Sequence, residues 1–109
     1  SGNDDLILPV MSIGGSGVIS VWANIQPKIV HELVKDTQDG RWQQAKEKQL
    51  NALELIHALF SETNPIPVKA AMSLLDLPSG PLRLPLVSLS KEKKKQLAQL
   101  LLKERTVEK

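Results

Sequence analysis

The sequence contains no cysteine and no tyrosine, and its only aromatic residues are one phenylalanine and two tryptophans. The absence of cysteine excludes disulfide bonds and thiol catalysis. Because aromatic side chains are so few, any core must consist mainly of leucine, isoleucine, valine and alanine, a composition that suits packed helices. No apolar run approaches the ~18 residues that a membrane-spanning helix requires. We therefore expect no membrane partner.

The chain also lacks a strong excess of positive or negative charge. The chain has 109 residues, with 14 Lys plus Arg against 12 Asp plus Glu, which is enough for one small domain. Proteins that bind nucleic acid concentrate basic residues on one face. The densest basic run, Lys91 to Lys95, has no interleaved aromatic residues for base stacking. We interpret this run as the solvated start of a helix and expect no nucleic-acid partner.

The clearest periodic pattern predicts a helix that begins after Asn24, a good N-cap residue, with Pro27 in its first turn. Asp39-Gly40 is typical of the end of such a helix. The apolar residues recur at the helical period and form one stripe. They are Ile25, Ile29, Val30, Leu33 and Val34.

Three further helices are expected. One runs from about Trp42 to Phe60, one begins near Pro67, and one begins after Ser90 as its N-cap. The prolines and the glycine between Pro78 and Pro85 predict an extended connection between the last two helices.

Only Val18 to Val21 is typical of a β-strand, because the segment is short and β-branched and follows a cluster of glycines. A strand needs ladder partners for its backbone groups, and the sequence offers no convincing second strand. The order loop, helix, strand, helix is typical of a parallel α/β protein. A (β/α)8 barrel needs ~250 residues, so the pattern indicates a fragment whose other strands are missing or belong to another chain.

Three motifs that could carry chemistry have simpler structural interpretations. The glycines from Gly14 to Gly17 precede the expected strand, whereas a phosphate loop follows its strand, so a helix C-cap and a tight turn are favoured. His31 and His57 lie far apart with no cysteine nearby, so no metal is expected. We expect His31 at the surface and His57 in helix packing or at a subunit face. One of Asp4 and Asp5 is expected to cap the short helix that follows.

Two groups of motifs resemble a known family. The first group is Ser1-Gly2-Asn3-Asp4, Gly14-Gly15, Gly17-Val18-Ile19-Ser20-Val21 and Ala23-Asn24; the second is Asn64-Pro65-Ile66-Pro67-Val68-Lys69 and Leu82-Arg83-Leu84-Pro85-Leu86. In this order they resemble the region of the last two barrel strands and the C-terminal helical segment of the dihydrodipicolinate synthase family. The Asn64 to Lys69 run is the more specific, and it argues against the sister enzymes that cleave sialic acid or keto-sugar acids.

The resemblance implies a fold that is mainly α in this fragment. Residues 1–38 would be the last part of a (β/α)8 TIM barrel, with one remaining strand, and residues 39–109 a C-terminal helical domain. The family is a class I aldolase-like lyase that condenses pyruvate with aspartate semialdehyde through a lysine Schiff base, on the diaminopimelate route to lysine. The resemblance further implies a cytoplasmic homotetramer (plastid in plants), and we expect no cofactor and no metal.

Carried over by position, the backbone of Ile19 would lie at the pyruvate site, and Gly2 and Asp4 would line the mouth of the active site. Asn3 departs from the aspartate that is usual in the family, and Trp22 from a small or polar residue. The family's Schiff-base lysine and proton-relay tyrosines lie upstream of the matched region. All eleven lysines of this chain are expected to be solvated, and tyrosine is absent. The fragment is therefore predicted to be inactive alone.

Two alternatives stay open from the sequence. The chain could be part of another pyruvate-dependent aldolase of the same superfamily, or a non-catalytic helical interaction module. For a fragment of a barrel, the missing barrel contacts predict self-association, with Val18 to Val21 as a segment that could pair between chains. Whether the chain alone unfolds cooperatively and stays monomeric discriminates between these interpretations.

Overall fold

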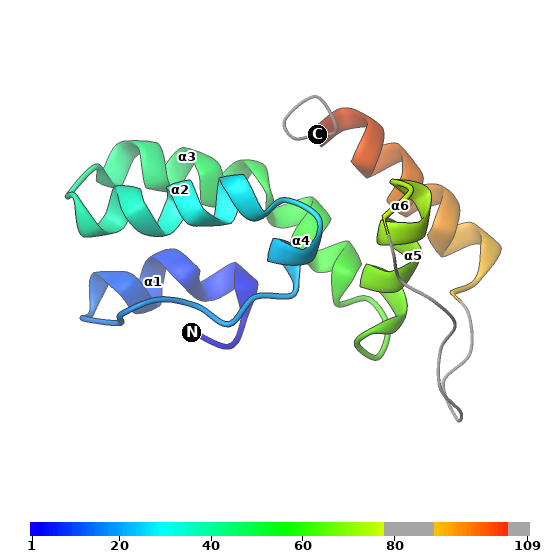
Figure 1. Cartoon of the computed structure of the whole chain (residues 1–109), viewed down its shortest axis with the longest axis horizontal. Coiled ribbons are helices and arrows are strands. Elements are labelled where there is room, and N and C mark those ends of the chain that lie inside the picture. The colour runs from blue at the N-terminus through cyan, green and yellow to red at the C-terminus, as the bar shows by residue number, and fades with distance from the viewer. Residues whose placement is uncertain (78–88, 105–109) are drawn as a thin grey trace.

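The computed structural model describes residues 1–77 and 89–104 of the chain. These residues form a helical protein that is longer than it is thick (Figure 1). The elements are the 3-10 turn η1 (Asp4–Leu6), α1 (Ile7–Ser12), the 3-10 turn η2 (Trp22–Asn24), α2 (Pro27–Gln38), α3 (Trp42–Asn51), α4 (Leu53–Leu59), α5 (Ile66–Leu74) and α6 (Lys91–Glu104). Helices α1, α2 and α3 pack together at one end, and α4 packs with α5 and α6 at the other.

One hydrophobic cluster extends through both groups of helices. The apolar stripe predicted for the first long helix is confirmed, since Val30 and Leu33 are buried and Ile29 and Val34 pack against the core. Trp22 is among the largest fully buried side chains, and its indole N–H donates to Gln26 Oε1 at 2.7 Å. Burial of the indole with its polar group paired explains how this position accepts a tryptophan. The cluster continues across the proposed boundary at residue 38.

The start of α2 differs from the prediction. Asn24 does not cap this helix but ends the 3-10 turn η2, and Gln26 occupies the N-cap position. Both the backbone N–H and the side-chain amide of Asn24 donate to the carbonyl oxygen of Val21, at 3.1 and 3.0 Å. The side chain of Asn24 therefore acts as a donor within the short turn, whereas an N-cap residue accepts a helix N–H with its side-chain oxygen. Pro27 is the first residue of α2, as expected.

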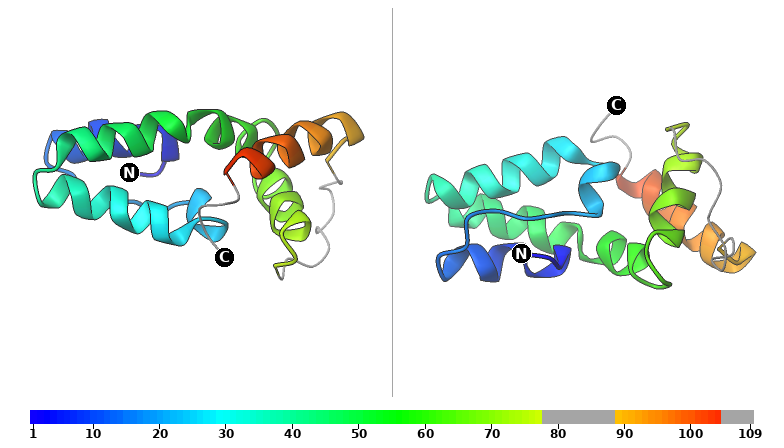
Figure 2. Two further views of the ribbon diagram at one scale, coloured as in Figure 1. Left: turned by 90° about the horizontal axis from the view of Figure 1, so that it is seen from above. Right: turned by 60° about the horizontal axis from the view of Figure 1, so that its bottom comes forward.

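The single helix predicted from Trp42 to Phe60 is interrupted at Ala52 and forms α3 and α4. The two halves pack against different partners: α3 lies along α2 and α1, whereas α4 contacts α5 and α6. Figure 2 shows this change of neighbours along the green part of the chain. The pattern of apolar residues could not reveal the break, because both halves carry an apolar face.

The two later helices begin as predicted. Pro67 lies in the first turn of α5, and the Ser90 hydroxyl accepts a hydrogen bond from the N–H of Lys93 at 3.3 Å at the start of α6. The extended connection predicted for Pro78 to Pro85 lies outside the described residues.

The interpretation of the glycine cluster as a helix end is confirmed. The N–H of Gly14 donates to the Met11 carbonyl at 3.2 Å, and the N–H of Gly15 donates to the Val10 carbonyl at 2.9 Å. This pair of bonds is the Schellman motif, which places a residue with positive φ directly after the C-cap. Gly14 has φ +105°, a conformation that side chains with a Cβ rarely adopt.

The strand predicted over Val18 to Val21 is wrong, because residues 1–77 and 89–104 contain no β-strand. Val21 has helical dihedral angles, φ −75° and ψ −43°, and leads directly into η2. A β-strand is defined by its ladder, and among the described residues the only ladder-like backbone bonds of the extended segment are those with Ser1. Figures 1 and 2 show it as an irregular stretch that returns from the end of α1, past the N-terminus, to η2.

Candidate functional site

Two of the predicted site residues line one surface hollow. Ser1, Gly2, Gly17, Val18 and Ile19 surround an open depression of about 390 Å³. Gly2 is exposed, and the Ile19 side chain is 88% exposed. The structure thus brings together residues that are 17 positions apart and that the sequence assigned to the same site.

The backbone at this hollow has the hydrogen bonds of a parallel β-pair. The amino group of Ser1 donates to the Gly17 carbonyl at 2.7 Å, and the Ile19 N–H donates to the Ser1 carbonyl at 2.9 Å. One residue that bonds to both neighbours of its opposite residue is the pattern of parallel strands. Ser1 and Val18 therefore lie opposite each other as two parallel strands would, although a single pair makes no sheet.

Asp4, the third predicted site residue, does not line the hollow but is buried beneath this segment, with 1% of its surface exposed. One carboxylate oxygen accepts the backbone N–H groups of Val21 and Trp22 at 3.1 and 3.3 Å. The other accepts the hydroxyl of Ser20 at 2.5 Å. The expected capping role is therefore corrected: the carboxylate binds donors at the start of η2, later in the sequence, and makes no cap bond to α1.

Gln49 belongs to the same buried network and was not anticipated from the sequence. Its side-chain N–H donates to the Asp4 carbonyl oxygen at 3.0 Å, and its Oε1 accepts the N–H of Leu8 at 3.0 Å. Gln49 lies on α3 between Ala45 and Ala52, which are both buried. A polar residue at helical spacing between two small apolar residues was the signal that could have identified it.

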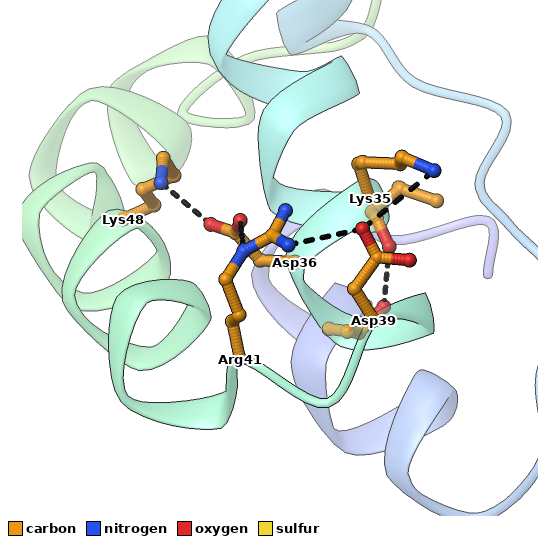
Figure 3. A network of polar contacts seen from close by, with 7 residues as sticks. Lys35, Asp36, Asp39, Arg41 and Lys48 are labelled. Atoms are coloured by element: carbon orange, nitrogen blue, oxygen red, sulfur yellow. Dashed lines mark hydrogen bonds and ion pairs between the residues drawn. The ribbon is translucent and has the colours of Figure 1, made fainter.

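A second buried carboxylate, that of Asp36, ties the end of α2 to α3 (Figure 3). It pairs with Lys48 Nζ at 2.5 Å and with Arg41 Nε at 2.9 Å, and Arg41 also reaches Asp39 at 3.0 Å. The hydrogen bond from Lys48 is the main reason that the pKa of Asp36 lies below its ordinary value of 3.8; burial opposes this shift, and Arg41 adds to it. In turn, the hydrogen bond that Arg41 donates to Asp36 raises the pKa of Arg41, and Asp39 contributes.

The two histidines lie apart in the described part of the chain. His31 is exposed, as expected. His57 has a side chain that is 65% exposed and lies 3.7 Å from Asp5, beside a hollow of about 220 Å³ that Asn3 and Phe60 also line. Within residues 1–77 and 89–104, no group of three His, Cys, Asp or Glu side chains is placed to hold a metal ion. In the same part of the chain, no helix is long and apolar enough to cross a membrane.

The described residues that line the hollow at Gly2 and Ile19 include no lysine. Lys48 has a side chain that is only 28% exposed, but it is paired with Asp36 on the α2–α3 side of the molecule (Figure 3). The expectation that every lysine is solvated is therefore only partly met at Lys48, which is half-buried. Its ion pair with Asp36 accounts for this partial burial.

The helical arrangement is that of one part of a known class of barrel enzymes. The structure superposes on a dihydrodipicolinate synthase from Aquifex aeolicus with a TM-score of 0.93 and 40% identity, covering 100% of this chain and 37% of that one. It also matches a dihydrodipicolinate synthase variant described as monomeric, with a TM-score of 0.91 and 41% identity over 99% of this chain and 36% of that one.

The sequence gives the same result. Residues 1–104 match the Dihydrodipicolinate synthetase family, and the chain belongs to this family. It is 53% identical over 92 residues to 4-hydroxy-tetrahydrodipicolinate synthase 1 of Clostridium acetobutylicum, a match that covers 84% of this chain and 31% of that protein. It is 48% identical over 101 residues to the 4-hydroxy-tetrahydrodipicolinate synthase of Methanocaldococcus jannaschii. The chain spans about a third of the length of these relatives.

Proposed function

We propose that this chain is the C-terminal part of a 4-hydroxy-tetrahydrodipicolinate synthase. In the whole enzyme a lysine outside this chain forms a Schiff base with pyruvate, which then condenses with aspartate semialdehyde. Residues 1–38 complete the barrel, and residues 39–109 form the C-terminal helical domain. The enzyme is a cytoplasmic homotetramer without a metal or cofactor, and the chain alone has no activity.

In this proposal the chain contributes one wall of the active site. Ile19 presents its backbone to pyruvate, and Gly2 leaves space beside it, since a Cβ built on Gly2 meets nothing within 4 Å. The observation that carries the proposal is the parallel pairing of Ser1 with Gly17 and Ile19 in a chain of this family. Such pairing is expected where neighbouring strands of a parallel barrel end at an active site.

Self-association of the isolated chain stays a prediction. Ile19 and Ile13 are 88% and 86% exposed, and the backbone beside Ile19 has the unpaired edge that invites pairing between chains. Sedimentation of the chain at increasing concentration would test this, and a monomer throughout would contradict it.

The experiment that tests the proposed function uses pyruvate and borohydride, followed by measurement of intact mass. Borohydride reduces a lysine–pyruvate imine to a stable amine and so records Schiff-base formation. The isolated chain is compared with a hybrid enzyme in which this chain replaces the matching third of the Clostridium acetobutylicum relative. We expect no added mass on the isolated chain, one added pyruvate on the hybrid, and turnover of aspartate semialdehyde by the hybrid.

The possible outcomes separate the alternatives. An adduct on the isolated chain would mean that one of its own lysines is activated, and the proposal that the Schiff-base lysine lies outside this chain would be wrong. A hybrid that forms the adduct but does not turn over aspartate semialdehyde would favour another pyruvate-dependent aldolase. A folded hybrid without any adduct would contradict a role of this chain in a pyruvate enzyme.

A further inference from the structure

Asp4 is a buried carboxylate that no ion pair neutralises among the described residues. Its exposed fraction is 1%, and all of its side-chain partners are neutral donors: the hydroxyl of Ser20 and the N–H groups of Val21 and Trp22. A buried charge is costly unless hydrogen bonds compensate for it. Three donors from consecutive residues therefore make this carboxylate an anchor for one short stretch of backbone.

The anchored stretch begins directly after Ile19. Ser20 Oγ also accepts the N–H of Ala23 at 2.9 Å, so hydroxyl and carboxylate together fix the turn that follows. On the other side, the N–H of Ile19 donates to the Ser1 carbonyl at 2.9 Å. Because the side chain of Ile19 is 88% exposed, apolar packing does not hold this residue. Polar contacts on both sides fix its backbone.

The backbone of Asp4 is held from a distant helix. Gln49, with 3% of its surface exposed, donates to the Asp4 carbonyl and accepts from Leu8, each at 3.0 Å. A side chain of α3 thus fixes the turn η1 that carries Asp4. One hydrogen bond joins Gln49 to the Asp4 backbone, and the side chain of the same residue is hydrogen-bonded to the backbone after Ile19.

We propose that Asp4 is a positioning residue for the pyruvate site, which holds the Ile19 backbone in place through Ser20, Val21 and Trp22. Gln49 holds Asp4 in turn. The inference rests on the proposed function, since it assumes that Ile19 faces pyruvate. Holding a substrate contact within a fraction of an ångström affects the binding of that substrate. The consequence should therefore appear in the KM for pyruvate.

The test compares two buried carboxylates in the hybrid enzyme described above. Asp4→Ala removes the anchor, and Asp4→Asn keeps one oxygen that can accept from Val21 and Trp22. Asp36→Ala and Asp36→Asn are the matched controls, because Asp36 is also buried but ties α2 to α3. We expect Asp4→Ala to raise the KM for pyruvate about tenfold, the factor that corresponds to ~1.4 kcal/mol. Asp4→Asn should recover most of this loss.

Both Asp36 variants should leave the KM for pyruvate unchanged while lowering the melting temperature. A KM that responds equally to the Asp4 and Asp36 variants would overturn the inference, since loss of stability alone would explain it. If Asp4→Ala does not fold, Ser20→Ala is measured in its place, and an unchanged KM in that variant overturns the inference as well. A reference hybrid that forms no pyruvate adduct refutes the proposed function and this inference with it, an outcome distinct from an active hybrid that tolerates Asp4→Ala.

Discussion

Asp4 and Asp36 are both buried carboxylates, yet they are compensated in opposite ways. The carboxylate of Asp4 accepts one hydroxyl and two backbone N–H groups. That of Asp36 accepts from the ammonium of Lys48 and the guanidinium of Arg41. The first arrangement determines the path of the backbone between Ser20 and Trp22. The second joins side chains of α2 and α3 and the turn between them.

This difference predicts how the stability of each region responds to loss of its carboxylate, to salt and to pH. Neutral backbone donors cannot move to water when the acceptor is lost, because the fold holds them in place. Lys48 and Arg41 have side chains that are 28% and 45% exposed, so water can replace their partner. The Asp4 region should therefore be costly to disturb and insensitive to salt. The Asp36 region should be cheaper to disturb and sensitive to salt and pH.

The largest effect is expected from Asp4→Ala in the chain as it stands. The variant leaves the N–H groups of Val21 and Trp22 without their acceptor, and each such loss costs ~1–3 kcal/mol. We expect the free energy of unfolding in urea to fall by about 3 kcal/mol, with the same loss at low and high salt. If Asp4→Ala lowered the free energy of unfolding by less than Asp36→Ala does, the predicted order would be reversed. Water would then replace the Asp4 carboxylate as the acceptor for these N–H groups.

The second effect concerns the helix end in the same region. A Cβ on Gly15 would lie 2.6 Å from Val10 Cγ1 and 2.8 Å from the Val10 carbonyl oxygen, whereas a Cβ on Gly17 meets nothing within 4 Å. We expect Gly15→Ala to lower the free energy of unfolding by ~2 kcal/mol through overpacking and Gly17→Ala to change it little. Urea unfolding of both variants gives the comparison. Equal losses would mean that α1 shifts to accept the methyl group.

The sequence predicted the elements that local patterns determine. The α2 stripe, the proline in the first turn of α5, the Ser90 cap and the glycine helix end are all present. Each of these depends on residues within about one or two turns of one another, so their spacing carries the information. The family was also accessible, because its motifs are short and occur in order along the chain.

The sequence did not predict what depends on contacts between distant residues. The expected strand forms no ladder among the described residues, where its only ladder-like backbone bonds are those with Ser1. The break at Ala52 arises because α3 and α4 pack against different helices. Asp4 was expected at the site or as a local cap, but its partners lie at least 16 positions away, and Gln49 reaches it across 45 positions. Hydrogen bonds over such separations leave no periodic signal.

The smallest effect tests the charged side of the comparison. Because the pKa of Asp36 is lowered in the folded chain, its carboxylate stabilises the fold above the ordinary pKa of 3.8, and this contribution is lost as pH falls through the lowered pKa. Asp36→Asn should therefore lower the free energy of unfolding by about 1 kcal/mol near neutral pH. The difference between the chain and the variant should shrink below pH ~4.

Salt provides the control for this prediction. Partly exposed cationic partners are screened at ~1 M salt, so the cost of Asp36→Asn should decrease there, while the cost of Asp4→Ala should persist. Urea unfolding at two pH values and two salt concentrations measures how the cost of each variant depends on pH and on salt. If the cost of Asp36→Asn were independent of both pH and salt, its ion pairs would contribute nothing beyond packing. The two buried carboxylates would then stabilise the fold in the same way.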